Sequence, residues 1–137
     1  MVGTCSLRRI GILAALALAC LPLTAAAQQS RVPVLVGQDG PEFDACGTQG
    51  RVRGLDAKRD GFLAVRAGPD SSYAMVGKVH SGDVLNICDQ RGSWLGVVYS
   101  HDTKDCGVGT PWPRASTYDG PCLSGWVFDK YVAGFAG

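Results

Sequence analysis

The sequence predicts an all-β fold, a small barrel or sandwich built from five or six short strands. From residue 51 onward, apolar and polar residues alternate over short runs, which is the periodicity of a half-buried strand. Clusters of Gly, Pro, Asp and Ser interrupt these runs about every ten residues, as turns between strands do. No helix of ordinary length is indicated in this part of the chain.

Six runs fit the strand pattern, and the clearest is the one in which Leu63 and Val65 alternate with smaller or polar neighbours. A single helical turn is expected at Asp129–Tyr131, after which Val132 returns toward the core. The expected strands begin with Val52 and Leu55 and continue with residues 63–66, 75–80, 85–87, 94–99 and 124–128. Turn signals separate them at residues 68–70, 81–83 and 89–93.

Residues 1–27 are expected to be a cleavable secretory signal peptide. Arg8 and Arg9 provide a short basic region, and an apolar run follows from Ile10 to Leu23 before a group of small residues. The run is too short for a membrane anchor, which needs about 20 apolar residues. The mature protein is therefore expected in the periplasm or outside the cell. Lipid attachment at Cys20 is the alternative, and it would leave the protein tethered to a membrane.

Removal of the signal peptide changes the charge of the chain. The loss of Arg8 and Arg9 takes the formal net charge from +1 to −1. A nucleic-acid interface is usually strongly basic, so no nucleic-acid partner is expected. No later segment is apolar enough to span a membrane. The mature chain, residues 28–137, is long enough to bury one modest core.

Four cysteines remain after this cleavage, at positions 46, 88, 106 and 122. An even number of cysteines in an oxidising compartment predicts disulfide bonds. A zinc site would need two close-spaced pairs, which these spacings do not offer. Four cysteines allow three connectivities, and the sequence alone does not choose among them.

Residues 100–121 interrupt the strand pattern with a long loop rich in Gly, Pro and Asp. A structureless loop of this length is uncommon in a compact domain unless something constrains it. Cys106 and Cys122 lie near its ends, so a bond between them would close it and contribute about 3 kcal/mol in the loop-entropy description. We therefore hypothesise the pair Cys106–Cys122 and, by elimination, the pair Cys46–Cys88.

Several motifs resemble those of the bacterial Src homology 3 (SH3b) domain, and together they cover roughly residues 50–133. The chain also resembles a narrower group of exported, cysteine-containing proteins of this type, in which a cysteine-bounded insertion and a Gly-Pro-Cys precede the last strand. The motifs are Leu63-Ala64-Val65-Arg66-Ala67-Gly68-Pro69 with Tyr73 four residues on, Gly82-Asp83, Trp94 after a glycine turn, and Gly125-Trp126-Val127 followed by Tyr131.

This resemblance implies a small, partly open SH3b-like barrel of five or six strands. The long disulfide-closed loop would lie directly before the last strand. Residues 49–135 would form the domain, and residues 28–48, which are rich in Gln, Pro, Gly and Asp, would be a flexible lead-in.

The resemblance also implies a binding role, because related domains accompany cell-wall hydrolases and hold peptidoglycan or its peptides. The expected partner is therefore a peptidoglycan peptide or an envelope protein. Large, rigid aromatic side chains suit such a groove. Each candidate could instead fill the core or its rim, and Trp126 is the one that most resembles a core residue. The groove candidates are Tyr73, Trp94, Tyr131 and Trp126.

A second interpretation makes the protein a secreted inhibitor or effector that acts through residues 100–121. Loops held by a rigid scaffold commonly carry function. Trp112 and Tyr118 are the large apolar residues of this loop and would be its contact residues.

Enzymatic chemistry is not indicated, and no cofactor or metal is expected. The chain has two histidines, and its one glutamate, Glu42, lies in the lead-in, so no carboxylate pair of a glycosidase can be assigned. The spacing Asp56-x-Lys58-x-Asp60 resembles a calcium loop, but a lysine occupies a ligand position. The basic residues of this region suggest a mixed-charge surface or, alternatively, a face for an anionic ligand; they are Arg51, Arg53, Lys58, Arg59 and Arg66.

Overall fold

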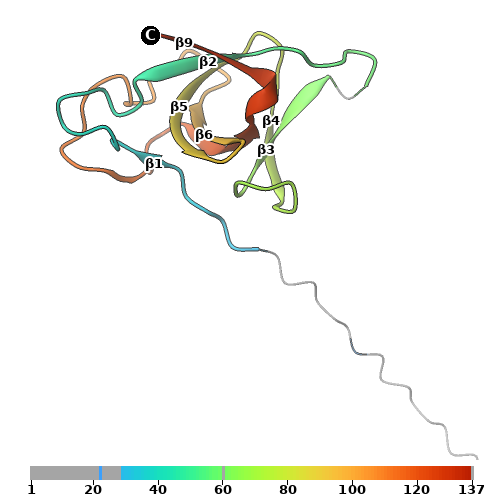
Figure 1. Cartoon of the computed structure of the whole chain (residues 1–137), viewed down its shortest axis with the longest axis horizontal. Coiled ribbons are helices and arrows are strands. Elements are labelled where there is room, and N and C mark those ends of the chain that lie inside the picture. The colour runs from blue at the N-terminus through green and yellow to red at the C-terminus, as the bar shows by residue number, and fades with distance from the viewer. Residues whose placement is uncertain (1–21, 23–28, 60, 137) are drawn as a thin grey trace, which may run out of the picture.

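The computed structural model describes residues 22, 29–59 and 61–136, and the expected signal peptide at 1–27 lies almost entirely outside them. Nine strands and one 3₁₀ turn make up the described chain, so the all-β prediction is confirmed (Figure 1). The elements are β1 Leu35–Val36, β2 Thr48–Val52, β3 Phe62–Arg66, β4 Met75–His80, β5 Val84–Arg91, β6 Trp94–Tyr99, β7 Ser116–Thr117, β8 Leu123–Phe128, η1 Asp129–Tyr131 and β9 Val132–Ala136.

Seven of the strands form one antiparallel sheet in the order β4-β3-β8-β6-β5-β2-β9. The sheet curves strongly through β5 and β6, but it does not close, because β4 and β9 remain at its two edges (Figure 1). The partly open barrel is thus observed with seven strands rather than five or six. The additional strand is β9, since residues 132–136 pair with β2 instead of only returning to the core.

The first strand of the barrel lies earlier in the chain than the sequence pattern suggested, because it ends at Val52, where the expected strand began. β2 runs from Thr48 to Val52, and Leu55 lies beyond it in the following loop. Gly54 has a φ of +75°, a conformation open to glycine, and it turns the chain away from the strand direction. This turn places the loop after β2 beside η1, where the amide of Arg53 donates to the carbonyl of Tyr131 at 2.9 Å.

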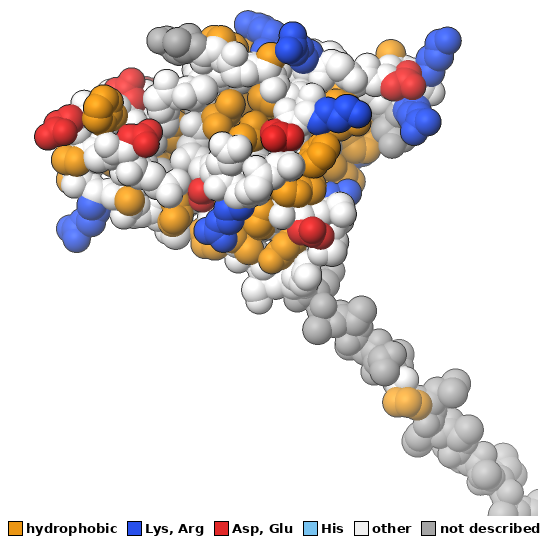
Figure 2. Space-filling view, in the orientation of Figure 1, with side chains coloured by type: hydrophobic (Ala, Val, Ile, Leu, Met, Phe, Trp, Pro, Cys, Tyr) orange, Lys and Arg blue, Asp and Glu red, His pale blue; other side chains and the backbone are white. Residues whose placement is uncertain are grey.

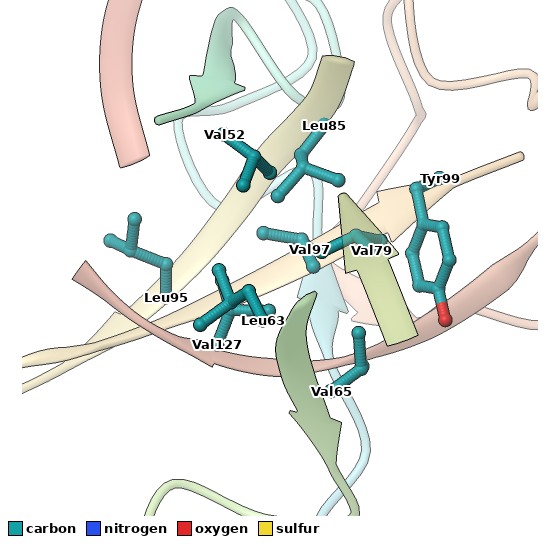
Figure 3. Close-up of a cluster of buried hydrophobic side chains, with 9 residues drawn as sticks. All are labelled: Val52, Leu63, Val65, Val79, Leu85, Leu95, Val97, Tyr99 and Val127. Carbon is teal, nitrogen blue, oxygen red and sulfur yellow. The ribbon is translucent and has the colours of Figure 1, made fainter. Parts of the chain in front are cut away.

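Aliphatic side chains on the inner side of the curved sheet form the barrel core (Figure 3). Every second residue of a strand faces this side, so each strand contributes alternate positions. The core needs no helix, because the curved sheet packs on itself. Its members are Val52, Leu63, Val65, Val79, Leu85, Leu95, Val97, Tyr99 and Val127.

A second cluster lies on the outer side of the same sheet, and β6 is buried on both faces as a result. Val97 belongs to the barrel core, whereas its neighbour Val98 packs in this outer cluster. Segments 29–47 and 100–121 supply most of the other members. The buried members of the outer cluster are Val36, Ala45, Cys46, Val98, Cys106 and Val108, and Cys88, Trp112, Tyr118 and Cys122 pack around them.

The two hypothesised disulfide bonds are confirmed, and both lie in the outer cluster. Cys46 is bonded to Cys88 on β5, and Cys106 is bonded to Cys122 next to β8. Two disulfides are typical of a protein from an oxidising environment outside the cytoplasm.

Residues 29–47 are packed onto the sheet, which differs from the flexible lead-in that their composition suggested. We call residues 29–36 the strap. Its amides and carbonyls are bonded along its length: Val32 donates to the carbonyl of Ala67 at 2.9 Å, and Leu35 donates to a carboxylate oxygen of Asp89 at 3.2 Å. The strap ends in β1, which pairs with β7 of the long loop. Two segments without regular periodicity thus cover one face of the barrel.

Candidate functional site

An open hollow among the described residues lies beside the seam between β3 and β8. These two strands share one residue pair, Arg66 with Trp126, and they contribute to the same hollow beyond it. The hollow has a volume of about 800 Å³, and we call it the groove. Its walls come from the loop after β2, the turn between β3 and β4, and the side chains of β6, β8 and η1.

Two of the expected ligand-binding residues, Trp94 and Tyr131, lie in this groove. Trp94 begins β6, and its cross-strand partner on β8 is Phe128. The Trp94 and Phe128 rings are 5.6 Å apart and tilted, and the Phe128 and Tyr131 rings are 6.3 Å apart. Such tilted contacts fix the orientation of each ring. The three side chains therefore form a continuous aromatic wall.

Phe128 was not among the expected site residues. It occupies the position directly before η1, and the strand pattern indicated it only as the end of the last expected strand. Its place beside Trp94 depends on the register between β6 and β8, which pairs Leu95 with Val127 and Trp94 with Phe128. The one sequence signal for Phe128 is that it directly follows the Gly125-Trp126-Val127 motif.

The rest of the groove is mainly apolar, with charged groups at its margins. Asp56 and Arg59 form an exposed ion pair at 3.7 Å on the loop side. Asp70 lies on the turn side, where the Ser72 amide donates to it at 2.8 Å and holds the pKa of its carboxyl below the usual value. The remaining apolar lining consists of Leu55, Phe62, Leu63, Ala64 and Met75.

Trp126 does not line the groove, although it lies two residues before Phe128 on the same face of β8. It is fully buried, and its indole Nε1 donates to the carbonyl of Val32 in the strap at 2.9 Å. The ring extends over its cross-strand neighbour Gly96, where no side chain competes for the space.

Tyr73 is also absent from the groove lining. Its ring covers Gly68, at which a Cβ atom would approach the ring to 2.5 Å, so the two residues close the turn between β3 and β4. The Tyr73 carbonyl accepts a hydrogen bond from the guanidinium of Arg66 at 3.0 Å. This turn carries Asp70 and thereby sets the position of one groove margin.

The two aromatic residues of the long loop are engaged within the outer cluster. Trp112 stacks on Tyr118 with 6.3 Å between ring centroids, and its Nε1 donates to the carbonyl of Gly107. The Tyr118 hydroxyl donates to the carbonyl of Cys106 and accepts from the amide of Cys122, so it bridges both ends of the disulfide-closed loop. Both rings thus hold the loop in shape.

Side chains that could perform acid–base chemistry are dispersed. His80 and His101 are exposed, and the His101 ring contacts the edge of Tyr99 at a centroid distance of 5.4 Å. Among the residues that the structure describes, no three His, Cys, Asp or Glu side chains meet as a metal site would require. Within the same described residues, no helix has the length and hydropathy of a membrane span.

Comparison with known proteins agrees with this architecture. The family model of the bacterial SH3 domain matches residues 61–133, which include β3 to β8 and η1 and all three aromatic residues of the groove wall. Domains of this kind are generally non-catalytic binding modules. No curated protein and no solved structure matches the chain.

Proposed function

Because the chain belongs to the bacterial SH3 domain family, we propose that it is an exported, non-catalytic binding module whose groove holds a cell-wall peptide or a short segment of an envelope protein. The observation that supports this most directly is the aromatic wall of Trp94, Phe128 and Tyr131 along an open, mainly apolar groove. Rigid aromatic side chains provide a large contact area with little loss of conformational entropy.

The dimensions of the groove suit a short ligand. A volume of about 800 Å³ lies within the usual range of sites for small molecules and peptides. One side of the groove is open, so a chain can lie along it and continue beyond its ends. Charged groups at the margins would fix the orientation of the ligand, whereas the apolar floor would provide most of the contact area.

Export is supported by the two disulfide bonds, which persist in oxidising compartments. The expected signal peptide would direct the protein to the periplasm or out of the cell. Lipid attachment at Cys20 would add only a tether, because the groove lies wholly within residues 55–131. The proposal is therefore the same for the free and the anchored protein.

The alternative role, inhibition through residues 100–121, receives less support. A contact residue must be free to meet a partner, and both Trp112 and Tyr118 use their polar atoms to bond the loop backbone. The groove aromatics have no such internal hydrogen bonds among the described residues. We therefore place the binding surface at the groove.

The test is a titration of the disulfide-intact protein with purified peptidoglycan fragments, together with sedimentation on intact cell-wall material. Trp94→Ala should weaken binding by about tenfold or more, as loss of a central aromatic contact does. Phe43→Ala is the matched control, because Phe43 is 59% exposed and lies in the segment that covers the outer cluster. Absence of binding by the unaltered protein, or equal binding by both variants, would contradict the proposal.

A further inference from the structure

We propose that the ligand of the groove is an acidic peptide, and that it places a carboxylate beside Arg53 and Lys130 at the Tyr131 end. This inference rests on the proposed function, since it specifies the chemistry of the ligand in the same groove. Arg53 and Lys130 lie next to Tyr131 rather than in the lining of the groove, and the charges nearest to them are already engaged by the protein.

Arg53 and Lys130 flank Tyr131 from two different segments. The backbone amide of Arg53 donates to the carbonyl of Tyr131 at 2.9 Å, which fixes residue 53 next to that end of the groove. The Lys130 ammonium lies 5.6 Å from the centre of the Tyr131 ring. Both side chains are exposed. Two cations therefore border the aromatic residue that ends the groove wall.

Neither cation is paired with a carboxylate among the residues that the structure describes, and Lys130 contacts only the face of the Tyr131 ring. Their side chains form no ion pair or hydrogen bond with these residues, whereas the guanidinium groups of Arg51, Arg59 and Arg66 are each engaged in one. Asp56 is paired with Arg59 and also accepts the amide of Lys58, so its carboxylate is engaged. A ligand carboxylate would thus be the natural partner of the two remaining cations, with charge-assisted hydrogen bonds.

The end of the groove away from Tyr131 carries a negative charge, that of Asp70. Asp70 lies on the turn after β3, and β3 spans about 13 Å from Phe62 to Arg66 at the usual rise of a strand. Arg66 at that end donates to the Tyr73 carbonyl, so it is partly engaged. A peptide with a carboxylate at one end would therefore be oriented with that end toward Tyr131 and away from Asp70.

A single acidic group fits these charges better than a polyanion does. In the orientation of Figure 2, Lys and Arg side chains lie along the upper edge, at the projecting corner and at the lower edge, with acidic side chains interspersed. The formal net charge of residues 28–137 is −1, whereas polyanion-binding domains are strongly basic overall. The basic character is thus local, and a peptide carboxylate matches it.

The experiment compares two forms of one probe, a muramyl peptide with free carboxylates and the same peptide with those carboxylates amidated. The unaltered protein should bind the free acid about tenfold more tightly, as expected for one carboxylate between two exposed cations. Raising the salt from about 0.01 M to about 1 M shortens the Debye length from about 30 Å to about 3 Å and should remove the preference.

The double variant Arg53→Gln/Lys130→Gln should bind both forms with the affinity that the unaltered protein shows for the amide. Lys104→Gln/Arg114→Gln removes the same charge from exposed cations of the long loop and should keep the preference. Equal binding of both forms by the unaltered protein would overturn this inference and leave the proposed function intact. Binding of neither form would overturn both.

Discussion

The indole nitrogen of Trp126 is bonded to the carbonyl of Val32, 94 residues earlier in the chain. This bond joins the strap to the centre of the sheet, between β6 and β3 in the strand order. The bond also explains why this tryptophan is buried although it shares a face of β8 with Phe128 of the groove wall: the ring fills the space over Gly96 and its nitrogen holds the strap.

Replacing Trp126 should lower stability without affecting the groove. Trp126→Phe leaves the partly buried Val32 carbonyl without its donor and reduces packing against the strap. We expect a loss of about 1–3 kcal/mol in the free energy of unfolding, measured by urea denaturation. Trp94→Phe is the converse control, since it should weaken ligand binding and leave stability nearly unchanged. A reversed pattern would show that the two tryptophans have been assigned the wrong roles.

Gly96→Ala should be among the more harmful small substitutions. A Cβ atom there would lie 2.6 Å from the Cβ of Asp89 and 3.3 Å from the ring of Trp126, and Asp89 is the residue that accepts the amide of Leu35. Overpacking of this kind costs about 1–3 kcal/mol. Gly109→Ala is the control, because no atom would lie within 4 Å of its added methyl group. Thermal unfolding of both variants measures the difference.

The two disulfides should differ in their contribution to stability. Cys106–Cys122 closes a sequence separation of 16 and Cys46–Cys88 one of 42. In the loop-entropy description these closures contribute about 3 and about 4 kcal/mol. Cys46→Ser/Cys88→Ser should therefore lower the unfolding midpoint more than Cys106→Ser/Cys122→Ser. Peptide mapping under non-reducing conditions checks the pairing, and a fragment linking Cys46 to Cys106 or Cys122 would refute it.

Stability should fall at alkaline pH partly because of Tyr99. Burial raises the pKa of its hydroxyl above the ordinary 10.0, and Arg31 offsets this only in part. Between the unfolded and folded pKa values the unfolded chain binds fewer protons, so stability decreases as the pH rises above about 10. Tyr99→Phe should lose this part of the decrease, as measured by urea denaturation at several pH values. An unchanged alkaline slope in the variant would contradict the assignment.

Local patterns in the sequence were sufficient for the fold class, and the need to constrain the loop at 100–121 led to the correct disulfide pairs. Trp94 and Tyr131 were indicated by the resemblance to the SH3b family, and both line one groove. Alternation along β3 and β6 and the turn residues between them depend on near neighbours only. The position of the strap could not be obtained in this way. Its bonds from Leu35 to Asp89 and from Val32 to Trp126 join residues 54 and 94 positions apart, and the segment has no periodicity.

Part of the groove lining also could not be predicted from local sequence patterns. Phe128 reaches Trp94 through strand register, and Leu55 reaches the groove because the chain turns at Gly54. Tyr73 and Trp126 have the composition of groove residues, but a bare glycine beneath each ring provides a better packing site elsewhere. Residue type alone could not show whether Tyr73 and Trp126 line the groove or pack elsewhere, because the position of each ring depends on which neighbouring residue is a glycine.

The bond between Cys46 and Cys88 has a mechanical consequence. If the segment before residue 29 is anchored and a ligand in the groove is pulled away from it, tension enters the molecule along the strap. Its contacts would yield one after another, since they lie in series along the chain. Peeling would stop at Cys46, because the covalent bond passes the load to β5, which is paired on both sides within the sheet. The peeled segment before Cys46 would then lengthen the protein, while the groove keeps its structure under load.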